Sequence, residues 1–141
     1  MRAYTRAAQS YGSVQLVTGV ATADNVQLIQ MLFDGLAESL ATARGHIENR
    51  NIQEKSNALS RASRIVVGLQ GALDFERGGE LATNLNELYA YMTRRILHVN
   101  ATNDLQALSE VSSLVRDIAD AWQSLPSLLS GTSQKSSQYV S

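Results

Sequence analysis

The sequence contains no cysteine and one proline, Pro126, and it carries almost no net charge. Without cysteine, the chain can form neither a disulfide framework nor a thiolate metal site. A formal charge of −1 lacks the basic excess of a nucleic-acid-binding face, so we expect no nucleic-acid partner. No stretch approaches the ~20 consecutive apolar residues of a membrane-spanning helix, so we expect no insertion into a membrane.

The remaining composition is typical of one folded domain. Hydrophobic residues make up 44% of the chain and charged residues 18%, unlike the composition of disordered proteins. A chain of 141 residues suits a single domain, because about 100–200 residues per domain is usual. The absence of cysteine is compatible with a reducing compartment, and we expect a soluble, cytoplasmic protein.

Apolar residues recur at spacings of three and four along most of the chain, which is the period of amphipathic helices. Short connections make neighbouring helices antiparallel, so the expected fold is all-α, an up-down-up-down four-helix bundle. A Gly/Ser-rich N-terminal arm is expected before the bundle, and a Ser-rich, disordered C-terminal tail after it. The predicted segments are the arm 1–23, the bundle 24–126 with helices near 24–48, 52–75, 80–100 and 104–126, and the tail 127–141.

Individual residues mark the expected helix ends. Asp24 and Gln27 are spaced as a capping box, in which each side chain accepts a hydrogen bond from a backbone N–H of the first turn. Asn103 or Asp104 can cap the fourth helix. Pro126 has no N–H to donate and is expected to end that helix.

The glycine pair Gly78-Gly79 precedes a long Leu/Tyr/Met pattern. Gly78 stands where the second helix must end, a position where left-handed backbone is easy for glycine. Glu80 then suits the positive end of the next helix dipole. A phosphate-binding loop requires a longer glycine-rich segment after a strand, with Lys-Ser/Thr behind it. The pair therefore predicts a turn between two helices.

No arrangement typical of catalysis is visible. Di-iron bundles use Glu-x-x-His pairs, but Ala43 and Arg95 stand three residues before the two histidines, His46 and His98. No nucleophile–base pair appears at helical spacing. We expect a protein that is not an enzyme and binds no metal or cofactor. A metal- or phosphate-handling bundle enzyme is the distant alternative, and one metal per chain would favour it.

Two features of the helices indicate a surface that binds another polypeptide. Tyr89 and Tyr91 widen the apolar arc of the third helix, and tyrosine is enriched at interfaces. Alternatively, Tyr89 completes the core and Tyr91 lies on the surface. Gly68 and Gly71 stand inside the second helix, where each costs ~1 kcal/mol relative to alanine. They mark either a solvated face or a shallow groove for a partner helix.

Two stretches, "LDFERGGELATNLNELYAYMTRRIL" and "NDLQALSEVSSLVRDIADAW", resemble the flagellar secretion chaperone family FliS. In that family an LD-x-E-x-GG turn precedes N-L-x-x-L-Y-x-Y-M, and an N-D start leads to a helix ending in A-W. "LIQMLFDGL" is similar to the family's L-x-x-M-L-Y-E-G, and the resemblance extends over about residues 11 to 125. The matching positions of the two stretches are Leu73, Asp74, Glu76, Gly78, Gly79, Asn84, Leu85, Leu88, Tyr89, Tyr91, Met92, Asn103, Asp104 and Trp122.

The resemblance implies a cytoplasmic chaperone without catalytic activity or cofactor. Its client would be flagellin, through the disordered C-terminal segment, and the loaded pair would dock on a membrane protein of the flagellar export gate. The alternative is a general helical adaptor with a different client. The N-terminal arm is either a mobile terminus or a cover over an apolar strip that a partner displaces. The residues expected to line or cover the client groove are Tyr11, Asn84, Tyr89 and Met92, with Leu85 and Ile96 partly in the core.

Overall fold

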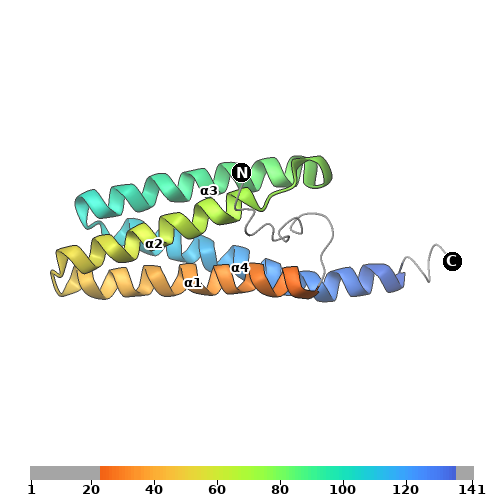
Figure 1. Ribbon diagram of the computed structural model, residues 1–141, viewed down its shortest axis with the longest axis horizontal. Coiled ribbons are helices and arrows are strands. Elements are labelled where there is room, and N and C mark those ends of the chain that lie inside the picture. The colour runs from red at the N-terminus through yellow and green to blue at the C-terminus, as the bar shows by residue number, and fades with distance from the viewer. Residues whose placement is uncertain (1–22, 136–141) are drawn as a thin grey trace.

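In the computed structural model of the protein, the backbone is described for residues 23–135 and the side-chain surroundings for residues 26–124. It consists of four α-helices: α1 (Ala23–Glu48), α2 (Ile52–Gly71), α3 (Phe75–Thr102) and α4 (Leu105–Lys135). α1 and α3 each pack against both α2 and α4, so the helices surround one common core (Figure 1). The predicted all-α four-helix bundle is confirmed. None of the described helices combines the length and hydropathy needed to cross a membrane.

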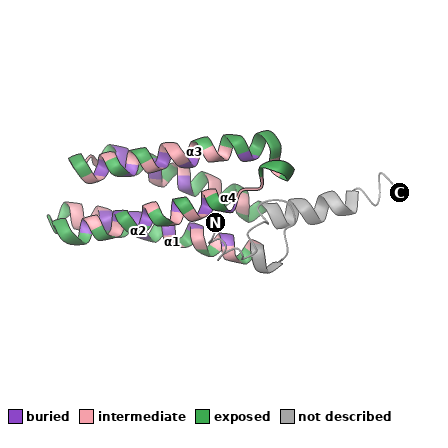
Figure 2. Ribbon diagram, turned by 45° about the horizontal axis from the view of Figure 1, so that its top comes forward, coloured by how far each residue is buried: buried purple, intermediate pink, exposed green. Residues whose placement is uncertain are grey.

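Each helix places one apolar stripe in this core, and the buried positions follow the inner faces of the ribbons (Figure 2). Most of the buried residues recur at the predicted spacings of three and four. Full burial of a Leu, Ile or Phe side chain contributes about 1.5–3 kcal/mol. The largest buried side chains are Ile29, Phe33, Leu36 and Leu40 of α1, Leu59, Val66 and Leu69 of α2, Met92, Ile96 and Val99 of α3, and Leu108 of α4.

The α2–α3 connection differs from the prediction. α2 ends at Gly71 and α3 begins at Phe75, not near Glu80. The reason is an N-cap at Asp74, whose carboxylate accepts hydrogen bonds from the backbone N–H groups of Glu76 and Arg77 at 3.0 and 3.1 Å. This cap stabilises a short helical turn before the glycine pair.

The glycine pair therefore lies inside α3 and kinks it. Gly79, not Gly78, has the positive φ, with φ 52° and ψ −127°. At position 78 there is no room for a side chain, because a Cβ there would lie 2.8 Å from the Cβ of Ala82. The two glycines thus serve different physical purposes, and the prediction of a left-handed Gly78 was wrong.

The C-terminal boundary also differs. The helix continues past Pro126 to Lys135, so the segment expected as a tail begins as a continuation of α4. A proline removes one hydrogen bond and crowds the carbonyl four residues earlier, which kinks a helix without always ending it. The predicted capping box at Asp24 lies outside the residues whose side chains are described.

The end of the bundle that carries the α1–α2 and α3–α4 connections is tied by polar contacts. Asn103 ends α3 in the left-handed region, with φ 58°, and Asp104 caps α4 by accepting from the N–H of Ala107 at 3.0 Å. The buried Lys55 Nζ donates to the carbonyl of Asn100 at 2.9 Å and to Asn103 Oδ1 at 2.8 Å. These bonds hold the start of α2 to the end of α3.

Candidate functional site

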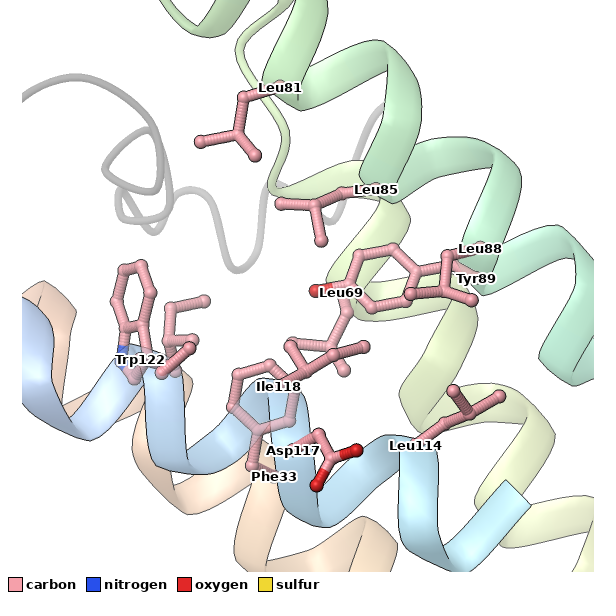
Figure 3. A pocket seen from close by; sticks show the side chains of 12 residues that line it. Phe33, Leu69, Leu81, Leu85, Leu88, Tyr89, Leu114, Asp117, Ile118 and Trp122 are labelled. Atoms are coloured by element: carbon pink, nitrogen blue, oxygen red, sulfur yellow. The ribbon is translucent and has the colours of Figure 1, made fainter. Parts of the chain in front are cut away.

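Towards the opposite end of the bundle, the first half of α3 and the middle of α4 enclose an apolar groove. Its volume is about 410 Å³. Side chains from both walls point into the same space (Figure 3). It is lined by Ile29 and Phe33 of α1, Leu69 of α2, Leu81, Leu85, Leu88 and Tyr89 of α3, and Leu114, Asp117, Ile118, Ala121 and Trp122 of α4.

The groove has a buried floor and a partly exposed rim. Phe33 and Leu69 each have 2% of their surface exposed and belong to the core, whereas Leu81 at the rim is 66% exposed. Trp122 is held in place because its indole Nε1 donates to the carbonyl of Val26 at 3.2 Å. Large apolar side chains that share an open space mark a binding surface more often than scattered exposed ones do.

Polar contacts between α3 and α4 cluster away from the groove. Glu110 accepts a hydrogen bond from the Tyr91 hydroxyl at 2.6 Å and one from Arg95 Nε at 3.0 Å. The bond from Tyr91 lowers the pKa of Glu110, and the same bond raises the pKa of Tyr91. No hydrogen bond between α3 and α4 is found among the groove-lining side chains of residues 26–124, so these walls face each other through mostly apolar surface.

Residues 7–128, most of the chain, match the model of a protein family described as "Flagellar protein FliS". The chain belongs to the FliS family. It is 46% identical over 118 residues to the flagellar secretion chaperone FliS of Salmonella typhimurium, covering 83% of this chain and 87% of that protein. It is 42% identical over 120 residues to the flagellar secretion chaperone FliSB of Pseudomonas aeruginosa, covering 85% and 95% of the two chains.

FliS of Escherichia coli, also named a flagellar secretion chaperone, is 42% identical over 116 residues, or 82% of this chain and 85% of that protein. All three relatives are named flagellar secretion chaperones. Among the described residues, no group of three or more His, Asp or Glu side chains is placed to hold a metal ion. The groove is therefore the candidate site of this FliS-family chain.

Two of the site residues predicted from the sequence line the groove. Leu85 is half-buried on the α3 wall. Tyr89 is 4% exposed, so its ring completes the core, which was the alternative interpretation of this residue. It also lines the groove. Asn84 is exposed on α3 but does not line the groove.

Other predicted residues lie elsewhere. Met92 and Ile96 are 0% and 1% exposed, so both belong to the core beyond the groove. Tyr11 lies outside the described residues. The assignment of these three to a client site is untested and stays a prediction.

Several groove residues were absent from the predicted site. By its spacing Leu81 belongs to the apolar stripe that predicts the buried face of the third helix, but it is largely exposed, because the start of α3 is not covered by α4. Ile118 and Trp122 fall on the apolar spacing that predicts the inner face of the fourth helix, whereas Leu114 does not belong to that predicted stripe. The sequence feature that indicates the groove is the wide apolar arc of Leu81, Leu85, Leu88 and Tyr89. This arc is wider than packing against one neighbouring helix requires.

Gly68 and Gly71 lie on α2 and do not line the groove. A Cβ built at either position would meet no atom within 4 Å, and neither glycine has a positive φ. Both therefore occupy ordinary helical backbone beside open space. Whether this face takes a partner helix is a separate prediction.

Replacing Gly68 by alanine should raise the free energy of unfolding by about 0.4–1 kcal/mol, since alanine restricts the unfolded chain and fits the helical backbone. Urea unfolding followed by circular dichroism measures this. Gly71→Ala is the matched second variant, with the same expected sign. Unchanged client affinity in both variants would contradict the hypothesis that Gly68 and Gly71 form a groove for a partner helix. A stable variant that no longer binds the client would support it.

Proposed function

We propose that this protein is a cytoplasmic flagellar export chaperone whose groove binds the disordered C-terminal segment of flagellin. Binding would prevent premature polymerisation, and the loaded chaperone would deliver flagellin to the membrane protein of the flagellar type III export gate. The observation that carries the proposal is the partly exposed apolar groove between α3 and α4. Membership of a family whose relatives are named flagellar secretion chaperones supports it.

The groove suits an amphipathic, unfolded client. A disordered segment can lay leucine-sized side chains between Leu81, Leu85 and Leu88 on one wall and Ile118 and Trp122 on the other. It loses conformational entropy on ordering, which lowers affinity for a given contact area and keeps the complex reversible. Masking those side chains removes the surface through which flagellin subunits would associate. Release needs no nucleotide, because export or assembly competes for the same segment.

The finer site assignments are part of this proposal. Leu85 and Tyr89 contact the client directly, and Asn84 adds a polar contact beside the groove. Met92 and Ile96 support the α3 wall from the core. Tyr11 of the N-terminal arm, which lies outside the described residues, is a further residue of the proposed client site.

The proposal is tested by calorimetric titration of the full chain with a peptide of the flagellin C-terminal segment. We expect saturable binding with a negative heat-capacity change, which is the mark of apolar surface leaving water. A flagellin fragment that lacks its C-terminal segment is the control and should produce no binding heat. Absence of binding to the intact segment would contradict the proposal.

The alternative, a general helical adaptor, predicts a different result in cells. A pulldown from a flagellated lysate would then recover another protein and no unpolymerised flagellin. Recovery of flagellin that depends on its C-terminal end would reject the alternative.

A further inference from the structure

The indole N–H of Trp122 already donates to Val26, which leaves two other polar side-chain groups in the apolar groove, the hydroxyl of Tyr89 and the carboxylate of Asp117. They come from opposite walls, Tyr89 from α3 and Asp117 from α4 (Figure 3). In binding sites lined mostly by apolar side chains, a few polar groups decide which ligand binds and in which orientation. These two groups therefore determine which polar groups the bound segment must present to the groove.

The Tyr89 hydroxyl is a hydrogen-bond donor without a partner among the described residues. The side chain is 4% exposed, and its oxygen faces the groove in Figure 3. Burial raises the pKa of Tyr89 far above its usual range, so the hydroxyl stays protonated and can donate. A client that covers it without offering an acceptor leaves the donor unsatisfied and loses affinity.

Asp117 places a negative charge at the same groove. Its carboxylate forms no ion pair with any described residue, and the residue is exposed to water in the free chain. A purely apolar client would strip water from this carboxylate and leave it uncompensated, which is unfavourable. A lysine or arginine on the client would replace the lost water by a charge-assisted hydrogen bond.

We propose that the groove selects a client segment whose apolar face is interrupted by a lysine or arginine opposite Asp117 and by a hydrogen-bond acceptor opposite Tyr89. This inference rests on the proposed function and adds the chemistry and register of the bound segment. Apolar contacts alone tolerate sliding by a helical turn, whereas two polar contacts on opposite walls fix one position. The polar pair therefore also selects against apolar segments that lack these groups.

The test compares Asp117→Asn with Asp120→Asn in titrations with the flagellin C-terminal peptide. Both residues are exposed aspartates of α4, and only Asp117 lines the groove, so the two variants match in net charge and in helix. We expect about fivefold weaker binding for Asp117→Asn, in the range of single exposed ion pairs, and unchanged binding for Asp120→Asn. The loss should shrink as ionic strength rises from about 0.01 to about 0.1 M, because salt screens the pair.

The client partner is found by replacing each lysine and arginine of the peptide by glutamine. One of these peptides should bind the native chain about fivefold more weakly and lose nothing further against Asp117→Asn, which is the signature of a direct pair. Equal affinity of the native chain and Asp117→Asn, or equal losses for Asp117→Asn and Asp120→Asn, would overturn the pairing. In either case retained binding of the native chain leaves the proposed function standing, whereas no binding by the native chain rejects both.

Tyr89→Phe tests the second contact, because it removes only the hydroxyl. We expect an unchanged melting temperature and about threefold to tenfold weaker peptide binding, as for the loss of one hydrogen bond. A folded Tyr89→Phe variant with native affinity would overturn the acceptor contact. A variant with a lowered melting temperature would show that the hydroxyl serves the bundle itself, and that result also overturns it.

Discussion

Replacing Leu81 by glutamate should weaken binding of the flagellin C-terminal segment about thirtyfold or more, and the same replacement at Leu97 should leave binding unchanged. Both leucines are on α3, and they are 66% and 61% exposed. The free bundle therefore loses little buried apolar area in either variant. Only Leu81 lines the groove, so only there does the client lose an apolar contact and cover a carboxylate instead. A loss of about 2 kcal/mol or more is usual at such interface positions.

The pair of variants separates the groove from general surface effects. Leu81→Glu and Leu97→Glu change the net charge equally, and glutamate is a good helix former, so melting curves of both should superimpose on that of the native chain. Calorimetric titration with the flagellin peptide then gives the two affinities. Equal affinities in the two variants, with both bundles folded, would show that the client binds elsewhere.

The fold could be predicted from the sequence because its determinants are local. The spacing of Ile29, Phe33, Leu36 and Leu40 requires a helix with one buried face, and all four are buried. Short connections then leave the antiparallel bundle as the simplest arrangement. Asp104 was one of two possible caps for the fourth helix, and its hydrogen bond to the Ala107 N–H confirms it.

The groove could be predicted only in part, because helical periodicity says which face of a helix is apolar and not whether a neighbour covers it. Leu81 and Met92 belong to one predicted stripe, but Leu81 is 66% exposed and Met92 is 0% exposed. The difference arises from the distance between α3 and α4, which opens from one end of the bundle to the other (Figure 1). That distance depends on side chains far apart in the sequence. Asp117 was missed for the same reason.

The backbone conformation of the glycine pair could also be predicted only in part. Two adjacent glycines indicate a turn, but the residue that takes the unusual dihedral angles depends on the Asp74 cap and on the position of Ala82. The cap extends the helical turn up to Gly78. The kink is thereby moved to Gly79, directly before the groove wall that starts at Leu81.

Gly79→Ala should lower the free energy of unfolding by about 1–3 kcal/mol, the usual cost of forcing a side chain into such a backbone conformation. The dihedral angles φ 52° and ψ −127° are open to glycine and closed to residues with a Cβ. Nothing lies within 4 Å of a Cβ built there, so the penalty is conformational and not steric crowding by neighbours. For a domain of this size, about 2–4 °C in melting temperature is expected per kcal/mol.

Further variants separate the conformational cause from steric crowding. Gly71→Ala, on helical backbone in α2, should raise stability. Gly79→Asn should not rescue the fold, because asparagine tolerates the left-handed helical region near ψ +47° and not ψ −127°. Gly78→Ala should also destabilise, but through its 2.8 Å contact with the Ala82 Cβ, so adding Ala82→Gly should restore part of the loss there and none at Gly79. A Gly79→Ala chain as stable as the native one in urea would mean that α3 runs straight through this position, and the groove wall at Leu81 would then have to be placed differently.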